Sequence, residues 1–219
     1  PGSKNTMGDL KWMRQNGMEA AILKLAAANV PVLGICGGYQ MLGESIEDPD
    51  GEEGGGSLHG MGLLPVRTVF GKEKVQTRVT GEILQNPGAG DGLFSALSGS
   101  VFSGYEIHMG HTTGNGKNSF SRIRTLTNGS TEAEEDWQAD GAVCGNVAGT
   151  YVHGLFEDGS LTKNLCGALL SKKGICAEAL TQDYAAFKES QYDLLAAEVR
   201  KVLDMEQIYR MMEKQEGDR

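Results

Sequence analysis

The sequence is short of several features, and each shortage excludes a class of protein. It has no run of about 18 apolar residues, the length that a membrane-spanning helix needs. A charged start followed by an apolar stretch, which marks a secretory signal peptide, is also missing. Basic residues number 20 against 29 acidic residues, so the formal net charge is −9. Because such a surface repels phosphates, we expect no nucleic-acid partner, and we expect no membrane partner either.

Cysteine is also scarce, and its four positions are Cys36, Cys144, Cys166 and Cys176. No Cys-x-x-Cys pair and no Cys/His cluster with zinc spacing occurs, so we expect no bound metal. Four cysteines in 219 residues are too few for a disulfide framework. These observations predict a cytoplasmic protein with free thiols, and the length fits one domain over residues 1–219.

The order of helical and apolar segments predicts an α/β fold. Residues 8–17 and 18–29 have apolar positions at helical spacing, with Gly17 as a stop between them. Residues 30–35 form a short apolar run, which is typical of a strand buried on both faces. Residues 39–46 return to a helical pattern. Helix, buried strand, tight turn and helix are the elements of a parallel sheet flanked by helices.

The rest of the sequence predicts a β-rich middle and a helical tail. Residues 48–60 are acidic and rich in glycine, and we interpret them as a mobile loop. Residues 61–127 contain short strand-like runs, and residues 127–141 form a polar loop. Two more β-rich runs lie in residues 142–156, and the charged segment 181–216 has an apolar helical face.

The stretch "GICGG", residues 34–38, follows the predicted strand directly. Glycines two residues before and after Cys36 would relieve crowding of the backbone where a strand turns sharply into a helix. The turn would place Cys36 at a helix N-terminus, where the dipole favours the thiolate, and would aim the Gly37 N–H at an oxyanion. The pattern favours a nucleophile, while a buried cysteine packed between glycines stays open as the alternative.

A cysteine nucleophile needs a base, and the histidines available are His59, His108, His111 and His153. His153 ends a strand-like run just before a glycine, where α/β enzymes carry site residues. His108 is the second candidate, although His108 and His111 could each be structural. His59 falls in the glycine-rich loop, where we expect it to be solvated.

Four separate motifs carry a resemblance that covers nearly the whole chain. They are "PGSKNT" at residues 1–6, "GICGGYQMLG" at 34–43, "GYEIHMG" at 104–110 and "GTYVHGLF" at 149–156. In this order they resemble the class I, triad-type glutamine amidotransferases. The resemblance implies a flavodoxin-like fold, with a mixed, mainly parallel sheet flanked by helices.

The resemblance also implies roles for individual residues. Cys36 would attack the side-chain amide of glutamine, and His153 would activate the thiol and protonate the departing ammonia. Water would then hydrolyse the glutamyl thioester. Gly2, Ser3 and Gly37 would form the oxyanion hole. The positions that match glutamine-binding residues of the family are Gln40, His108, Met109 and Gly110.

One position departs from the family pattern. Related amidotransferases complete a triad with a carboxylate two residues after the histidine, and this sequence has Leu155 there. We therefore expect a Cys–His dyad, whose imidazole tautomer is less firmly fixed. Glu157 and Glu106 stay open as groups that could orient His153.

The resemblance further implies partners beyond the given residues. In relatives a strand precedes the "PGSK" loop, and an ATP-dependent synthetase domain precedes that strand in the same polypeptide. We expect this chain to bind glutamine and no cofactor, since no G-x-x-x-x-G-K-[ST] motif occurs. ATP and Mg²⁺ would bind only in the N-terminal synthetase domain, which would amidate a corrinoid in cobalamin biosynthesis. A missing strand would leave an exposed sheet edge; alternatively, residues 1–3 are a cloning remnant before Met7.

Other hypotheses come from the same family and from different classes. Within the family, the chain could be the glutaminase that serves the amidation of lipid II, or the glutaminase of a cobyrinic acid a,c-diamide synthase. From other classes, a cysteine peptidase or hydrolase could share the turn, but it has no need of Gln40 or of the "EIHMG" segment. A non-catalytic interaction module would leave the surroundings of Cys36 and His153 unexplained. The motifs favour an enzyme that amidates adenosylcobyrinic acid a,c-diamide.

Overall fold

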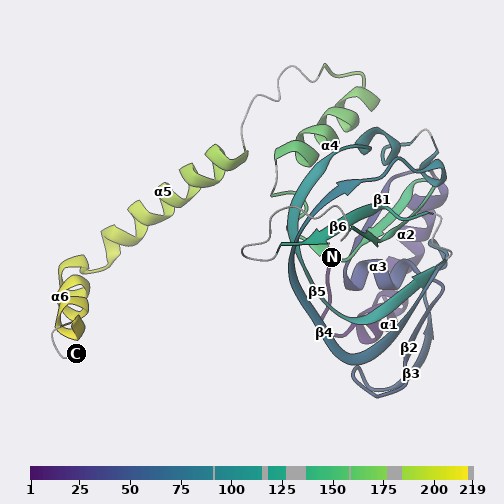
Figure 1. The fold of residues 1–219 in the computed structure, drawn as a ribbon, viewed down its shortest axis with the longest axis horizontal. Helices are drawn as coiled ribbons and strands as arrows, with labels where there is room; N and C mark the ends of the chain where they lie inside the picture. The colour runs from purple at the N-terminus through teal and green to yellow at the C-terminus, as the bar shows by residue number, and fades with distance from the viewer. Residues whose placement is uncertain (91, 115–117, 127–136, 158, 177–183, 217–219) are drawn as a thin grey trace. The chain divides into compact units, whose positions relative to one another are not determined.

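The structure of the chain is a computed structural model that describes residues 1–90, 92–114, 118–126, 137–157, 159–176 and 184–216. The chain divides into two compact units, Pro1–Leu180 and Thr181–Arg219, and each is described by itself (Figure 1). The single domain over residues 1–219 stays a prediction. The polar loop predicted at residues 127–141 lies largely outside the described residues.

The first unit begins with two short helices. The helices of this unit are α1 (Thr6–Gln15), α2 (Met18–Ala27), α3 (Gly37–Leu42) and α4 (Gly159–Lys172), with 3₁₀ turns at Pro87–Ala89 and Ser95–Leu97. The side chain of Asn5 caps α1 by accepting the N–H of Gly8 at 2.8 Å, which supplies one of the bonds that a helix start lacks. Gly17, with φ of 74°, separates α1 from α2, as the sequence predicts.

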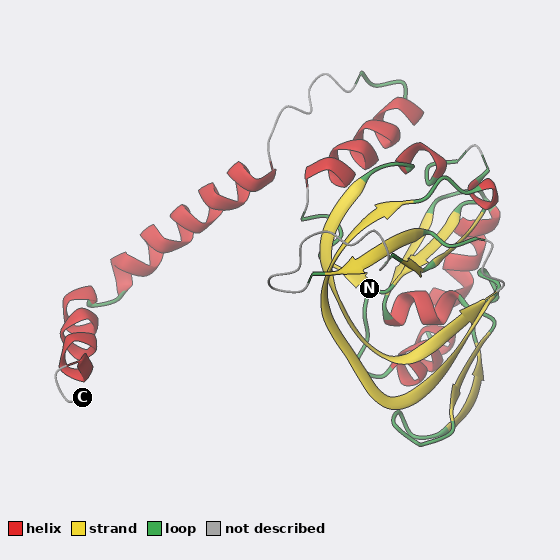
Figure 2. Cartoon of the chain, in the orientation of Figure 1, coloured by secondary structure: helices red, strands yellow, loops and turns green. Residues whose placement is uncertain are grey.

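The strands of this unit form two sheets. The strands are β1 (Val32–Ile35), β2 (Ser45–Asp48), β3 (Gly56–His59), β4 (Val66–Ile83), β5 (Val101–Gly114), β6 (Ser121–Thr125), β7 (Gln138–Asp140), β8 (Ala142–Cys144), β9 (Val147–Thr150) and β10 (Val152–His153). One sheet has the order β1-β9-β8, and the other has the order β10-β5-β4-β2-β3, with β6 on β4 and β7 on β6. Together with the helices that pack on them, the sheets make a mixed α/β fold, which confirms the predicted class (Figure 2).

The prediction of a mainly parallel sheet is wrong. Among the described strands, only β1 with β9 and β2 with β4 pair in parallel, and the other pairs are antiparallel. The physical reason is the long hairpin-like pair of β4 and β5, which runs as one curved ribbon through the unit (Figure 1). The described residues of the connection between them, within 84–100, form two 3₁₀ turns and no α-helix, so the connection lacks the helical crossover that usually joins parallel strands.

Residues 48–60 are another correction. We predicted a mobile loop, but β2 and β3 pair antiparallel from Ser45 with His59 to Asp48 with Gly56. The helical pattern predicted for residues 39–46 also ends early, because α3 stops at Leu42 and β2 begins at Ser45. The glycine content of this segment did not indicate its conformation, because hydrogen bonds from backbone N–H groups to the buried Asp48 side chain fix the turn between β2 and β3.

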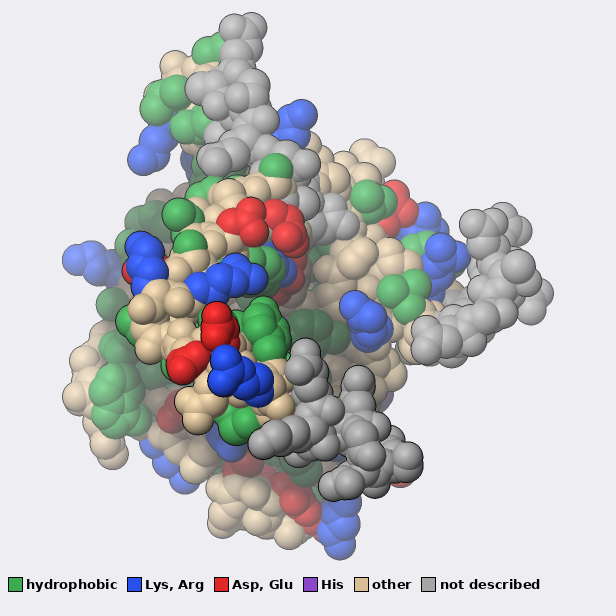
Figure 3. Space-filling model, turned by 90° about the vertical axis from the view of Figure 1, so that its left-hand side faces the viewer, with side chains coloured by type: hydrophobic (Ala, Val, Ile, Leu, Met, Phe, Trp, Pro, Cys, Tyr) green, Lys and Arg blue, Asp and Glu red, His purple; other side chains and the backbone are tan. Residues whose placement is uncertain are grey.

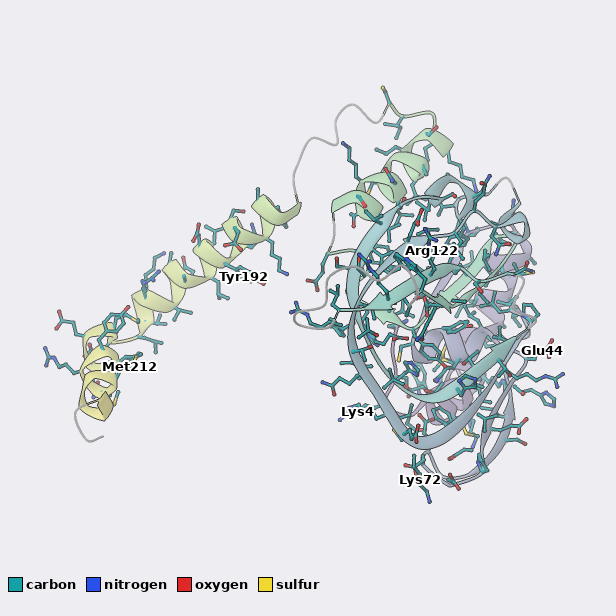
Figure 4. The ribbon with its side chains drawn as sticks, viewed as in Figure 1. Lys4, Glu44, Lys72, Arg122, Tyr192 and Met212 are labelled. Atoms are coloured by element: carbon teal, nitrogen blue, oxygen red, sulfur yellow. The ribbon has the colours of Figure 1, made fainter. Side chains whose placement is uncertain are left out.

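The second unit consists of α5 (Tyr184–Val202) and α6 (Met205–Glu216), which confirms the predicted helical tail. Apolar side chains on these helices are exposed; Figure 4 places Tyr192 on α5 and Met212 on α6. No described helix is long and apolar enough to cross a membrane. On the face shown in Figure 3, acidic and basic side chains are interspersed.

Candidate active site

Cys36 occupies a sharp turn between a strand and a helix. β1 ends at Ile35 and α3 begins at Gly37, and the Cys36 backbone between them has φ of 55° and ψ of −113°. A positive φ is costly for a side chain other than glycine, and such strain gathers at functional sites. The turn is held by two bonds: the Cys36 N–H donates to Thr150 O at 2.9 Å, and the Gln40 N–H donates to Cys36 O at 3.0 Å.

The glycines around Cys36 are needed because other backbone lies against them. A Cβ at Gly34 would lie 2.7 Å from the carbonyl of Gly38. One at Gly38 would lie 2.9 Å from Pro1 O, which also accepts the Gly38 N–H at 2.9 Å. These distances are too short for a side chain, so the spacing "GICGG" follows from close packing of the turn.

The predicted oxyanion residues meet at this turn. A Cβ at Gly37 would lie 2.9 Å from both the N and the Cβ of Ser3. A Cβ at Gly2 would lie 3.1 Å from Cε1 of His153 and 3.8 Å from Sγ of Cys36. The structure therefore brings the N-terminal loop, the nucleophile and the candidate base together around Gly2.

Four effects act on the pKa of the Cys36 thiol. Burial, the largest, raises the pKa, whereas the N–H of Gly37 and the positive charge of the amino terminus lower it; the negative charge of Glu53, the smallest effect, raises it. The net pKa is above the ordinary value of a thiol. The thiol donates a hydrogen bond to Ile107 O at 3.4 Å. A thiol with a raised pKa is mostly protonated near neutral pH, so Cys36 needs a base to become a nucleophile.

His153 is the candidate base, and its imidazole is only partly tied down. Its ring lies parallel to that of Tyr105, with centroids 5.6 Å apart. Among the described residues, Nε2 of His153 is buried without a hydrogen-bond partner. Most buried polar atoms are paired, so an unpaired ring nitrogen beside a thiol is unusual. Catalytic hydrogen bonds are often loose without substrate, so the unpaired Nε2 is consistent with the predicted role of His153 as the base.

The carboxylate of related amidotransferases lies two residues after the histidine, and Leu155 occupies that position here. Leu155 is 2% exposed and belongs to the apolar core. Glu106 pairs in register with Val152, whereas Tyr105 pairs with His153, so Glu106 lies on the other face of the strand. Glu157 follows one turn later, where its N–H donates to Gly154 O at 2.8 Å. Orientation of His153 by Glu157 stays a prediction.

The predicted glutamine-binding residues form one hydrogen-bonded group. Gln40 is 2% exposed; its amide nitrogen donates to Met109 O at 3.0 Å and to the Tyr151 hydroxyl at 3.2 Å. Its amide oxygen accepts from the Thr6 hydroxyl at 3.1 Å. These bonds join α1, α3 and β5, so the structure gives Gln40 a positioning role, and a direct contact with glutamine stays a prediction.

His108 and Gly110 also lie in this group. Nδ1 of His108 is 3.2 Å from Gly110 O, and its Nε2 is 3.6 Å from the Glu106 carboxylate. The His108 ring stacks on Tyr151 with centroids 3.7 Å apart. Gly110 has φ of 89°, and β4 and β5 shift register beside it. His59 and His111 are exposed, as expected for His59.

Sequence reasoning missed a buried carboxylate behind the site. Asp140 accepts hydrogen bonds from the Ser121 hydroxyl at 2.7 Å, the Thr150 hydroxyl at 2.5 Å and the Tyr151 N–H at 3.1 Å. Burial raises its pKa, although these bonds oppose the shift. Because the Thr150 carbonyl accepts the Cys36 N–H, Asp140 braces the strand that holds the nucleophile. The sequence contains no motif that marks Asp140, and its position in a polar segment predicted only a loop.

A cavity of about 360 Å³ lies beside this carboxylate and the His108 ring. Its lining includes Glu106, His108, Thr112, Asp140 and Tyr151. The hydroxyls of Thr112 and Tyr151 form a hydrogen bond within this wall. The cavity is therefore bordered by the same network that positions Gln40.

Glu53 is the second residue that sequence reasoning missed. It lies in the turn between β2 and β3, where Asp48 accepts the N–H groups of Glu52, Glu53 and Gly55 at 2.7 to 2.9 Å. Burial alone would raise the pKa of Asp48, but these N–H groups hold it below its usual value. The Glu53 carboxylate accepts the N–H of Met7 at 2.8 Å, at the start of α1.

The four cysteines are free, as predicted: Cys36 is buried, Cys166 is half-buried, and Cys144 and Cys176 are exposed. Within the described part of the chain, no group of three or more His, Cys, Asp or Glu side chains is placed to hold a metal ion. The geometry that remains is a cysteine at a helix N-terminus, an imidazole beside it and backbone N–H groups around it. Such an arrangement can form and hydrolyse a thioester.

The family comparison agrees with this geometry. The model of the CobB/CobQ-like glutamine amidotransferase domain matches residues 1–161. Those residues include the turn at Cys36, the "GYEIHMG" strand and His153, so all the motifs that the sequence analysis singled out fall inside the match.

Several similar proteins are named cobyric acid synthase. Cobyric acid synthase of Ruminiclostridium cellulolyticum is 49% identical over 97% of this chain, and that of Photorhabdus laumondii is 46% identical over 97% of it. The chain spans about 40% of the length of these relatives. A solved glutamine amidotransferase of Thermotoga maritima is 18% identical, covers 89% of this chain and 71% of its own, and has a TM-score of 0.40.

Proposed function

The chain belongs to the CobB/CobQ-like glutamine amidotransferase family, and we propose that it is the glutamine-hydrolysing part of a cobyric acid synthase. The observation that carries the proposal is the meeting of Cys36 and His153 around Gly2, with Gly37 against the adjacent Ser3. The cysteine has the strained backbone of a nucleophile, and the imidazole has an unpaired, buried nitrogen. Neither feature serves the stability of the fold, so both support a reaction at this place.

Four steps describe the proposed reaction. His153 takes the proton of Cys36, and the sulfur attacks the side-chain amide carbon of glutamine. The oxyanion that forms is stabilised by the Gly37 N–H and by the backbone of Gly2 or Ser3. The imidazolium then gives its proton to the amide nitrogen of the substrate. Ammonia departs, and a glutamyl thioester remains on Cys36. Water, deprotonated by the same imidazole, then releases glutamate and restores the thiol.

The use of the ammonia follows from the relatives. They are named cobyric acid synthases, and this chain matches about 40% of their length. A synthetase part of the same polypeptide would bind ATP and Mg²⁺, activate peripheral carboxylates of adenosylcobyrinic acid a,c-diamide and convert them to amides with the ammonia. The chain itself supplies no phosphate-binding motif and needs none for glutamine hydrolysis.

The test is covalent labelling with 6-diazo-5-oxonorleucine, an electrophilic analogue of glutamine. We expect the label on Cys36 alone, because Cys36 lies at the strand-to-helix turn, where His153 and the N-terminal loop meet. Peptide mass spectrometry locates the label, and Cys144→Ser is the matched control because Cys144 is exposed and remote from the turn.

A second readout separates a catalytic from a structural cysteine. In the longer polypeptide, Cys36→Ser should abolish amidation with glutamine and leave amidation with free ammonia unchanged. Loss of both activities, or label on another cysteine, would contradict the proposal. Cleavage of peptides without uptake of the label would favour the peptidase hypothesis instead.

A further inference from the structure

Tyr105 is an aromatic residue beside the candidate base that the thioester chemistry does not use. It lies on β5 and pairs across the strands with His153 of β10. Tyr105 is 41% exposed, so the fold gains less hydrophobic stabilisation from this ring than from a core tyrosine such as Tyr39, which is 3% exposed. Burial alone therefore does not account for a tyrosine at this position.

The pairing of β5 with β10 places the two rings on one face. Tyr105 is directly opposite His153, and residues directly opposite in an antiparallel pair point to the same side, with Cβ atoms about 5 Å apart. The planes of the two rings differ by 2°, and their centroids are 5.6 Å apart. Parallel rings at this distance have the offset stacked arrangement that aromatic pairs prefer. The register of the strands thus fixes the stack.

A glycine adjoins each member of the stack. Gly104 precedes Tyr105, and a Cβ there would lie 2.3 Å from His153 O, so only glycine lets the two strands approach this closely. Gly154 follows His153 with φ of 74°, where other residues are strained, and a Cβ there would lie 3.5 Å from Cε1 of Tyr105. The backbone of both strands therefore allows a close contact between Tyr105 and His153.

Hydrogen bonding at Nε2 does not hold the imidazole of His153, because this atom has no partner among the described residues. Leu155, at the position where related amidotransferases carry a carboxylate, is 2% exposed and belongs to the apolar core. Glu106 lies on the opposite face of β5, where its carboxylate is 3.6 Å from Nε2 of His108. The contact with Tyr105 holds the imidazole through its face instead.

The proposed reaction puts a positive charge on this imidazole, because His153 becomes an imidazolium when it takes the proton of Cys36. The face of an aromatic ring carries partial negative charge and attracts a cation within about 6 Å of its centroid. With centroids 5.6 Å apart, Tyr105 and His153 are within this range. The ring of Tyr105 can therefore stabilise the charge in the place where it forms.

We propose that Tyr105 is a positioning residue for His153. Its ring fixes the plane of the imidazole and stabilises the imidazolium, the two tasks that an orienting carboxylate performs in a catalytic triad. This inference rests on the proposed function, because it needs His153 to be the base. Since Tyr105 acts through the imidazole, its removal changes the maximal rate of the reaction at Cys36 and not the affinity for glutamine.

The experiment measures how fast 6-diazo-5-oxonorleucine labels Cys36 in variants of the full chain. Tyr105→Leu should lower the maximal labelling rate about 3- to 10-fold, the range for an aromatic ring pair, without changing the label concentration that gives half of that rate. Tyr105→Phe keeps the ring and should keep the rate. Val101→Ala, the matched control, changes an exposed side chain on the same face of β5 and should keep the rate as well.

A double-mutant cycle shows whether Tyr105 acts through His153. In the His153→Asn background, Tyr105→Leu should lower the labelling rate no further, whereas a merely structural role lowers it equally in both backgrounds. An unchanged rate in Tyr105→Leu, equal losses in the two backgrounds, or an equal loss in Tyr105→Phe would overturn the inference and leave glutamine hydrolysis standing. No labelling of Cys36 in the wild type would overturn both. Should Tyr105→Leu fail to fold, Tyr105→Ile, a stronger strand former without a ring, replaces it.

Discussion

His108 and His153 lie on paired strands, each stacked on a tyrosine, yet their nitrogens have opposite surroundings. Both nitrogens of His108 face acceptors, Gly110 O at 3.2 Å and the Glu106 carboxylate at 3.6 Å. Nε2 of His153 is buried and has no partner among the described residues. A buried polar atom without a partner costs about 1–3 kcal/mol. The difference supports the prediction that His153, and not His108, is the base of the site.

The comparison extends to the residues behind each ring. Beyond His108 lie Tyr151, Gln40 and Asp140, whose polar atoms bond to one another or to nearby backbone. The His153 ring stacks instead on Tyr105, whose side chain is exposed. A network whose polar atoms are all hydrogen-bonded is rigid, as around His108. The unpaired nitrogen of His153 is free to take part in proton transfer.

The largest expected effect comes from exchanging each histidine for asparagine. His153→Asn should lower glutamine hydrolysis about 10²- to 10⁴-fold, because a general acid–base group is worth that much. His108→Asn should change the rate by less than about tenfold and mainly lower stability, since it breaks bonds of the wall. Release of glutamate and the urea midpoint measure the two effects. Equal losses of rate in both variants would break the distinction between the two histidines.

A smaller effect tests how the backbone positions His153. A Cβ at Gly104 would lie 2.3 Å from His153 O and 2.6 Å from the side chain of Val152. Gly104→Ala should therefore separate β5 from β10, costing about 1–3 kcal/mol as overpacking does, and should lower the rate of Cys36 labelling as well. Gly71→Ala, on β4, meets no atom within 4 Å and serves as the control. Urea denaturation measures the loss of stability, and the rate of Cys36 labelling measures the effect on the site. A Gly104→Ala variant that is labelled at the wild-type rate would show that the pairing of β5 with β10 does not position His153.

The smallest effect concerns the pH dependence of the Cys36 thiol. Burial raises its pKa, and the folded chain therefore holds the proton above the ordinary thiol value of about 8.5. The reaction of Cys36 with iodoacetamide should still rise with pH beyond about 8.5, because only the thiolate reacts. The same shift makes folding less favourable as pH increases above the unfolded value, since the folded state binds the proton more tightly. A rate that levels off below pH 8 would contradict this prediction.

Local patterns in the sequence sufficed to predict the turn and the helical segments. The glycines around Cys36, the stop at Gly17 and the helical tail each depend on neighbours in the chain, and the structure shows all three. The motif order also pointed to the amidotransferase family, which the family match shows. The parallel character of the sheet was predicted wrongly, because pairing of β4 with β5 joins residues tens of positions apart.

Only the tertiary structure decided which polar groups near the site are satisfied. Glu53 and Asp48 fall in a glycine-rich stretch that predicts a loop, and Asp140 follows a polar segment without a motif. Their partners, such as Met7 and Thr150, lie far away in sequence or across strands. The sequence by itself determined the nucleophile's turn, because the crowding of Gly34 against Gly38 is local. The close approach of Pro1 and Ser3 to this turn required the fold. The unpaired nitrogen of His153 and the buried carboxylate of Asp140 required the fold, because burial and hydrogen bonding depend on every element packed around them.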